Sequence, residues 1–252
     1  MSTINVRIAE GIAELELNRP DVRNAINLEM AREMGAALET LLKHDEVRAV
    51  VLSGAGSKAF ASGADVGELR ERTHREAFFA INASLFQKLE DFPRPTIAAI
   101  EGYALGGGLE LALACDLRVG SRAARVGLPE ATLGIYPAAG GTFRLPRLIG
   151  VGRAKDLIFT GRILEAEEAY ALGIFERLCE PGHAVQTARE LGHAIAANPA
   201  LALQVAKTAL NSAARGGDPH GVERLGQALL FDSPEKRERM TAFLEKRAKG
   251  KK

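Results

Sequence analysis

The first half of the chain alternates between short apolar runs and segments with helical periodicity. Residues 4–8 and 12–17 alternate in hydrophobicity on either side of Gly11, which predicts a β-hairpin. Apolar residues between Leu28 and Leu42 recur mostly at helical spacing, and Asn27 is a suitable N-cap for that helix. Further apolar runs predict strands at Val47–Leu52, Pro95–Glu101 and Asp116–Gly120. Strands that alternate with glycine-bearing loops and helices predict an α/β fold with parallel strands.

After Gly140 the pattern becomes mainly helical. Its segments predict helices at Gly152–Thr160 and Glu165–Leu172, a strand at Phe175–Leu178, and long helices from Ala184 onward. In the first half, a helical region is also expected between the loop that ends at Asp65 and Asp91. Asn198-Pro199 and Gly216–Pro219 are the clearest breaks. We therefore expect a core domain over residues 1–197 and a C-terminal helical region over residues 198–252.

Composition and charge narrow the classes of function. The 252 residues are 46% hydrophobic and 26% charged, as in an ordinary globular protein, and the formal net charge is +1. This charge and an aromatic content of 5% disfavour binding to nucleic acid or to an anionic membrane. Residues 235–252 carry eight Lys or Arg against three Glu. This basic tail is either a solvated helix end or a cationic element that reaches an anionic ligand or a neighbouring subunit.

Several common chemistries lack their motifs. The sequence contains no G-x-S-x-G, H-E-x-x-H, C-x-x-C or Walker motif, and Gly150-Val151-Gly152 does not complete a dinucleotide fingerprint. We therefore expect neither a metal nor a cofactor. With two cysteines, no signal-peptide pattern and no long uninterrupted apolar segment, a cytoplasmic location is expected.

Two glycine-bearing loops expose backbone amides beside predicted strands. They span residues 58–65 and 101–110, and the second contains the triple glycine Gly106–Gly108 at the start of an apolar helix. The first amides of a helix have no internal partner and can stabilise a developing oxyanion. Alternatively, the glycines serve only a tight turn and close packing of the helix on a strand.

Two glutamates lie beside these loops. Glu110 falls in the first turn of the apolar helix, and Glu130 follows Pro129 at a second predicted helical turn. They are candidates for a general acid–base pair, which requires two groups that converge on one substrate. The alternative is that each carboxylate only compensates a helix dipole.

The chain resembles the crotonase (enoyl-CoA hydratase/isomerase) superfamily over nearly its whole length. The resemblance rests on motifs that occur in one order: Asn18-Arg19-Pro20, Asn24–Asn27, Ala59–Asp65, Gly102–Glu110, Ala114–Asp116, Leu128–Glu130, Gly134–Thr142, Arg144–Pro146 and Thr160-Gly161.

This resemblance implies a spiral of repeated strand–strand–helix units with a C-terminal helical trimerisation region, and a homotrimer or a hexamer built as a dimer of trimers. It implies an acyl-CoA thioester as substrate. By position, the amides of Ala64 and Gly107 match the oxyanion hole of the family, and Glu110 and Glu130 match its two catalytic glutamates. The matching CoA-binding positions are Arg23, Ala25, Ala61, Ser62, Gly63, Ala64, Asp65, Val66, Gly106 and Gly107, with Phe243 and Lys246 contributed by a neighbouring subunit.

Retention of both glutamates favours an enoyl-CoA hydratase among the reactions of this family. The alternatives are a Δ3,Δ2-enoyl-CoA isomerase, another crotonase reaction, or a non-catalytic acyl-CoA-binding subunit. Ala139 and Phe143 depart from the residues common in the family, glycine and glutamine respectively. Both are expected near the acyl pocket, so the acyl chain length stays open.

Overall fold

The computed structural model describes residues 2–249. The chain folds into two compact units, Met1–Ala196 and Ala197–Lys252. The expected domains, 1–197 and 198–252, differ from these units by a single residue. The roles assigned to the two domains remain predictions.

The first unit is built on a sheet that contains six strands among the described residues, in the order β1-β2-β3-β5-β7-β10. The hairpin β1–β2 is antiparallel, as predicted, and every later pairing in this sheet is parallel. Strands β3 and β5 are apolar and buried almost throughout, because helices cover both of their faces. The strands are β1 (Ile4–Ala9), β2 (Ile12–Leu17), β3 (Ala49–Gly54), β5 (Thr96–Ile100), β7 (Leu117–Ser121) and β10 (Arg177–Cys179).

A second, smaller sheet contains four short strands in the described part of the chain, in the order β4-β6-β8-β9. Strands β4, β6 and β8 are parallel, and β9 is antiparallel to β8. In the three successive pairs β3–β4, β5–β6 and β7–β8, the first strand joins the first sheet and the next strand joins the second. The predicted spiral of strand–strand–helix units is therefore confirmed. The four strands are β4 (Ala59–Ala61), β6 (Tyr103–Leu105), β8 (Arg125–Gly127) and β9 (Leu164–Glu165).

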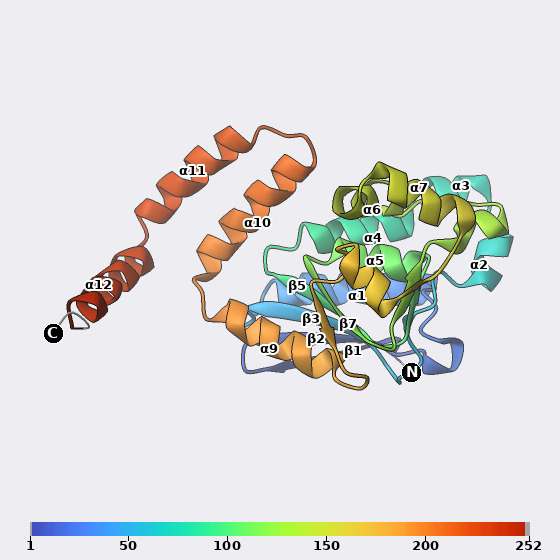
Figure 1. Cartoon of the computed structure of the whole chain (residues 1–252), viewed down its shortest axis with the longest axis horizontal. Helices are drawn as coiled ribbons and strands as arrows, with labels where there is room; N and C mark the ends of the chain where they lie inside the picture. Colours follow the sequence, from blue (N-terminus) through green and yellow to red (C-terminus); the bar gives the residue numbers. More distant parts are fainter. Residues whose placement is uncertain (1, 250–252) are drawn as a thin grey trace. The chain divides into compact units, whose positions relative to one another are not determined.

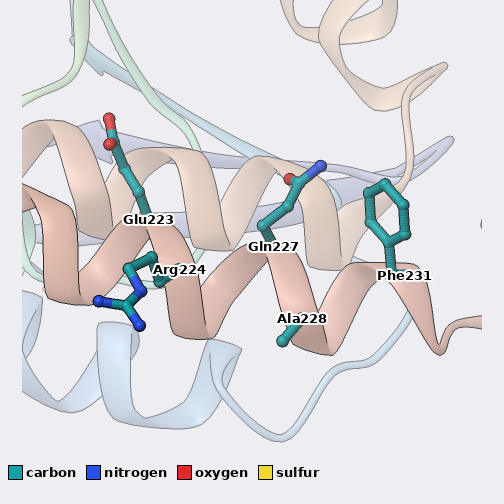
Figure 2. A pocket seen from close by; sticks show the side chains of 5 residues that line it. All are labelled: Glu223, Arg224, Gln227, Ala228 and Phe231. Carbon is teal, nitrogen blue, oxygen red and sulfur yellow. The ribbon is translucent and has the colours of Figure 1, made fainter.

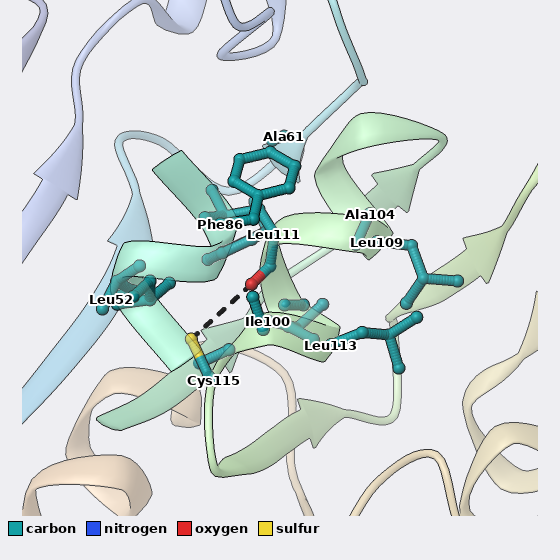
Figure 3. Packing of buried hydrophobic residues seen from close by; sticks show 14 of the residues in the cluster. Leu52, Ala61, Phe86, Ile100, Ala104, Leu109, Leu111, Leu113 and Cys115 are labelled. Carbon is teal, nitrogen blue, oxygen red and sulfur yellow. Dashed lines mark hydrogen bonds between the residues drawn. The ribbon is translucent and has the colours of Figure 1, made fainter. Parts of the chain in front are cut away.

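Helices cover the first sheet on both faces (Figure 1). Because successive side chains of a strand point to opposite faces, Val50 and Leu52 of β3 join the cluster that contains α1, α4 and α5, whereas Val51 packs toward α9. Figure 3 shows part of the larger cluster around α5, with Phe86 packed beside Leu111. The helices of this unit are η1 (Pro20–Val22), α1 (Leu28–Leu41), α2 (Val66–Glu71), α3 (His74–Phe78), α4 (Ile81–Glu90), α5 (Gly107–Ala114), η2 (Pro129–Leu133), α6 (Gly141–Ile149), α7 (Val151–Thr160), α8 (Ala166–Ala171) and α9 (Ala184–Ala196).

The local predictions hold best for the long periodic segments. Helix α1 begins after Asn27, whose side chain accepts a hydrogen bond from Met30 N at 2.9 Å, so the predicted cap is confirmed. The expected loop at residues 59–65 is wrong for its first three residues, because they pair with β6 as strand β4. The single helical region expected up to Asp91 is divided into α2, α3 and α4. Helix α6 was not predicted, since it contains Pro146.

The second unit consists of helices, as predicted. Helices α10 and α11 pack so closely that a Cβ atom at Gly226 would overlap with Val205 Cγ1. Both predicted breaks separate helices, and a further break between α11 and α12 was missed. A shallow depression on this unit is lined by residues of α11 alone (Figure 2), so it is not a site enclosed by several elements. The helices are α10 (Ala200–Ala214), α11 (Pro219–Phe231) and α12 (Pro234–Lys249).

Within residues 2–249, no helix combines the length and the apolar character needed to span a membrane.

Candidate active site

The predicted active-site groups follow three neighbouring strands of the small sheet. Ala64 comes shortly after β4, Gly107 directly opens α5 after β6, and Glu130 comes shortly after β8. These strands are parallel neighbours, so their carboxyl ends meet at one edge of the sheet. Groups that are up to 66 residues apart in sequence (64 to 130) therefore converge at one place.

Two backbone amides lie close together at this edge. A Cβ atom at Gly107 would lie 3.3 Å from Ala64 N, which places the two residues in contact. Gly106, the N-cap of α5, has φ 52°, and Gly63 has φ 112°, so glycine is needed at both turns. Within residues 2–249 neither the Ala64 nor the Gly107 amide donates a hydrogen bond to another backbone group. Both N–H groups thus lack a backbone acceptor among these residues, and they lie next to the positive end of a helix dipole.

A parallel bridge holds the Ala64 segment in place. Ile26 N donates to Gly63 O at 2.8 Å, and Asp65 N donates to Ile26 O at 3.0 Å. Because the residues on both sides of Ala64 are bonded to Ile26, the direction of the Ala64 amide is fixed by the neighbouring chain segment.

Glu110 lies buried in the first turn of α5, with 3% of its surface exposed. Its Oε1 accepts hydrogen bonds from Ala139 N at 2.7 Å and Gly141 N at 2.8 Å. Burial raises the pKa of Glu110, and these two hydrogen bonds and the charge of Arg144 oppose that rise. The two amides favour the ionised carboxylate, the form that can accept a proton.

Glu130 lies in η2 and is the less well bonded of the two carboxyls. Its Oε2 is buried and has no hydrogen-bond partner within residues 2–249, and a Cβ atom at Gly106 would lie 3.1 Å from its Oε1. Burial raises the pKa of Glu130 to about 7, and the charge of Glu110 contributes to that rise. The pair is therefore arranged with Glu130 as the more readily protonated member.

The predicted CoA-binding positions in the first unit lie on three segments that contact one another. Ser62 N donates to Arg23 O at 3.0 Å, and Arg19 donates to Ala25 O at 2.6 Å and pairs with Asp65 at 3.2 Å. The remaining predicted positions are Ala61, Gly63 and Ala64 on the same segment as Ser62, Val66 at the exposed start of α2, and Gly106 and Gly107 at the start of α5.

Phe243 and Lys246 lie on α12, in the second unit. Phe243 is 65% exposed. Their contact with the ligand from a neighbouring subunit remains a prediction.

Sequence reasoning missed the groups that hold the site residues. Asn24 is fully buried; it accepts from Arg19 N at 3.0 Å and donates to Ala59 O at 2.8 Å, so it ties the turn before Ile26 to β4. The amides of Ala139 and Gly141, which bind Glu110, were also missed. Asn24 and Gly141 both lie in motifs noted above, and that position is the only signal that the sequence offered.

The described residues, 2–249, contain no group of three or more His, Cys, Asp or Glu side chains that could hold a metal ion.

Comparison with known proteins identifies the family. The enoyl-CoA hydratase/isomerase family matches residues 7–251, and the chain belongs to it. A short-chain-enoyl-CoA hydratase of Clostridium acetobutylicum is 39% identical over 240 residues, which cover 94% of this chain and 92% of that protein. A crotonyl-CoA hydratase of Syntrophomonas wolfei is 36% identical over 242 residues, with coverages of 94% and 93%.

The fold is similar to that of solved members of the family. The crystal structure of an enoyl-CoA hydratase from Bacillus anthracis has a TM-score of 0.92 and 37% sequence identity, and the match covers 97% of this chain and 96% of that one. The crotonase-like fold expected from the sequence is confirmed.

Proposed function

We propose that this chain is an enoyl-CoA hydratase that adds water across the trans-2 double bond of enoyl-CoA thioesters to give 3-hydroxyacyl-CoA. The observation that carries the proposal is a pair of buried glutamates with unequal hydrogen bonding beside two available amides. The names of the relatives from Clostridium acetobutylicum and Syntrophomonas wolfei support the same reaction.

The two amides stabilise the transition state. Addition to a trans-2-enoyl thioester moves negative charge onto the thioester oxygen as an enolate forms. The N–H groups of Ala64 and Gly107 bind that oxygen more tightly as its charge grows, and this differential binding lowers the barrier. Loss of one such donor typically costs about 100- to 1000-fold in turnover.

The two glutamates move the protons. Glu110, as the base, takes a proton from water while the water oxygen forms a bond to Cβ. Glu130, as the acid, gives its proton to Cα, and the electron pair of the enolate forms that C–H bond. The proton on Glu110 then returns to Glu130 through solvent, so the enzyme is unchanged and one water has been consumed. Proton transfer and carbonyl polarisation suffice for this reaction, so we propose that it uses neither a metal nor a redox cofactor.

Substitution of either glutamate tests the proposal. Glu110→Gln and Glu130→Gln should each lower turnover of crotonyl-CoA by at least about 100-fold, measured as loss of the conjugated enoyl absorbance. Glu101→Gln is a matched control, because Glu101 also follows a buried strand and accepts bonds from two amides, Gly182 N and Ala184 N. It should retain wild-type turnover.

The outcome also separates the alternatives. Wild-type hydration by either glutamine variant would overturn the assignment of that residue. Conversion of 3-enoyl-CoA to 2-enoyl-CoA without hydration of crotonyl-CoA would indicate an isomerase. Binding of acyl-CoA without either reaction would indicate a non-catalytic subunit.

The proposal also includes a metabolic role and an oligomeric state. We propose a role in fatty acid or related acyl-CoA degradation and assembly as a homotrimer or a dimer of trimers through residues 198–252. Large apolar side chains exposed on α10, α11 and α12 support such an assembly: Leu210, Leu225, Leu229, Phe231, Met240 and Leu244. The cytoplasmic location remains a prediction.

A further inference from the structure

The loop that binds Glu110 rests on a buried arginine. Arg144, in the first turns of α6, is 4% exposed, and its Nη1 donates to Ala139 O at 3.0 Å. Its Nη2 donates to Glu90 Oε2 of α4 at 2.7 Å. A Cβ atom at Gly140 would overlap with Arg144 Nη1, and Gly140 has φ 121°. The guanidinium therefore fills the space directly against the loop backbone, between the loop and α4.

Ala139 links this arginine to the active site. Its carbonyl accepts from Arg144, and its own N–H donates to Glu110 Oε1 at 2.7 Å. Gly141 N, two residues further on, binds the same oxygen at 2.8 Å. With its carbonyl fixed on one side and its amide engaged on the other, Ala139 has little freedom to rotate away from Glu110.

We propose that Arg144 is a positioning residue for Glu110, an inference that rests on the proposed function. By fixing the Ala139–Gly141 loop, Arg144 directs two amides at Glu110 Oε1. No hydrogen bond among residues 2–249 engages Oε2, so that oxygen is left for the reacting water. When a supporting residue fixes the position of a catalytic group, removal of that residue lowers the turnover of the enzyme.

The charges around Glu110 come from three elements. Glu130 lies on η2, and its pKa is raised in part by the charge of Glu110. Arg144 of α6 lowers the pKa of Glu110, and Glu90 of α4 pairs with Arg144 on the far side. The ring of Phe143 lies 4.7 Å from the guanidinium carbon. Glu90 also pairs with Arg147 at 3.8 Å, and Arg147 is one third exposed. Removal of Arg144 and Glu90 together therefore takes away the support without leaving a fully buried charge unpaired.

The double variant R144M/E90Q tests the role. We expect kcat for crotonyl-CoA to fall by about tenfold or more, because a displacement of about 1 Å can cost roughly 100-fold. KM should stay within about twofold, since no CoA-binding position changes. The acid limb of the kcat profile should move to higher pH, because Glu110 loses a nearby positive charge. Loss of folded protein would instead lower the rate equally at every pH.

The matched control is R118M/E176Q. Arg118 is also buried, at 3% exposed; it donates to Ile174 O at 2.7 Å and Cys115 O at 2.9 Å and pairs with Glu176. This control removes a similar pair at the C-terminal end of α5, opposite to the end that carries Gly107 and Glu110, so kcat and the acid limb should be unchanged. An equal loss in both double variants would overturn the proposal, as would wild-type kcat in R144M/E90Q.

Two further measurements test the role of Arg144. The first uses a conservative variant, and the second does not depend on the proposed reaction. R144K keeps the charge but replaces the two donor nitrogens that bond Ala139 O and Glu90 Oε2 with one, so its kcat should fall between wild type and the double variant. Wild-type kcat in R144K refutes the bridging role.

The second measurement is NMR titration of ¹³C-labelled glutamate carboxyls, assigned with Glu110→Gln. The Glu110 titration should move to higher pH in R144M/E90Q, and an unmoved titration overturns the inference. If the wild-type enzyme hydrates no enoyl-CoA, the proposed function fails and this titration still decides the role of Arg144.

Discussion

Replacement of Glu130 by glutamine should make the protein more stable at alkaline pH while it lowers turnover by at least about 100-fold. The folded protein holds the Glu130 proton up to a pKa of about 7, against an ordinary value of 4.5. The stabilising contribution of the protonated carboxyl is therefore fully present below pH 4.5 and is lost as the pH rises through about 7. Glutamine has the shape of the protonated acid and never ionises, so it avoids this loss.

The magnitude follows from the size of the pKa shift. A shift from 4.5 to about 7 corresponds to about 3 kcal/mol at about 1.4 kcal/mol per pKa unit. At pH 8 the free energy of unfolding of Glu130→Gln should exceed that of the wild type by up to about 3 kcal/mol. At pH 4.5 the free energy of unfolding of Glu130→Gln minus that of the wild type should be about 3 kcal/mol smaller than at pH 8.

Urea unfolding at several pH values measures this difference. Protein concentration must be equal for both proteins, because assembly contributes to apparent stability. Glu29→Gln, an exposed glutamate in the first turn of α1, is the control, and its effect on unfolding should stay within about 1 kcal/mol, the usual size of an interaction with a helix dipole. A difference between Glu130→Gln and wild type that does not grow between pH 4.5 and pH 8 would refute the reasoning, because it would mean that the buried carboxyl carries no cost of ionisation.

A glycine substitution tests the scaffold, and a deletion tests ligand binding. Gly108→Ala should destabilise the fold by about 3 kcal/mol or more in urea unfolding, because its Cβ would overlap with Ala61 O. The control is Gly152→Ala, which should not change stability, because no atom lies within 4 Å of its Cβ. Deletion of residues 235–252 should weaken acyl-CoA binding in calorimetric titration, because it removes Phe243 and Lys246; unchanged affinity would exclude their predicted role.

The fold was predictable where a segment is long enough to show its own period. Helix α1 and the β1–β2 hairpin have several apolar positions each, so their patterns are unambiguous. Strands β4, β6 and β8 have three residues each and show no period. They exist because of pairing between distant segments, such as Ala59 with Tyr103, and a sequence does not display such pairing.

The candidate site was predictable to a similar extent. Glu110 and Glu130 stood out because each lies beside a glycine-bearing loop, and the family resemblance gave them roles. Their convergence depends on the register of the small sheet. Arg144 could not be found in this way, because its contact is with the carbonyl of Ala139 and its partner Glu90 lies 54 residues earlier in the sequence. A contact with a backbone carbonyl, or with a residue far away in the sequence, leaves no recognisable motif in the sequence.

The stacking of β4, β6 and β8 has a consequence for how such a protein can change over time. Neighbouring strands lie about 4.8 Å apart, so the sheet sets the spacing of the residues that follow the carboxyl ends of its strands. The backbone amides of Ala64 and Gly107, which we propose bind the substrate carbonyl, follow β4 and β6, and Glu130 follows β8. Replacement of Glu130 would alter the fate of the enolate and leave its binding intact. If the proposed site is correct, a single substitution at position 130 should therefore change the outcome of the reaction while the scaffold stays the same.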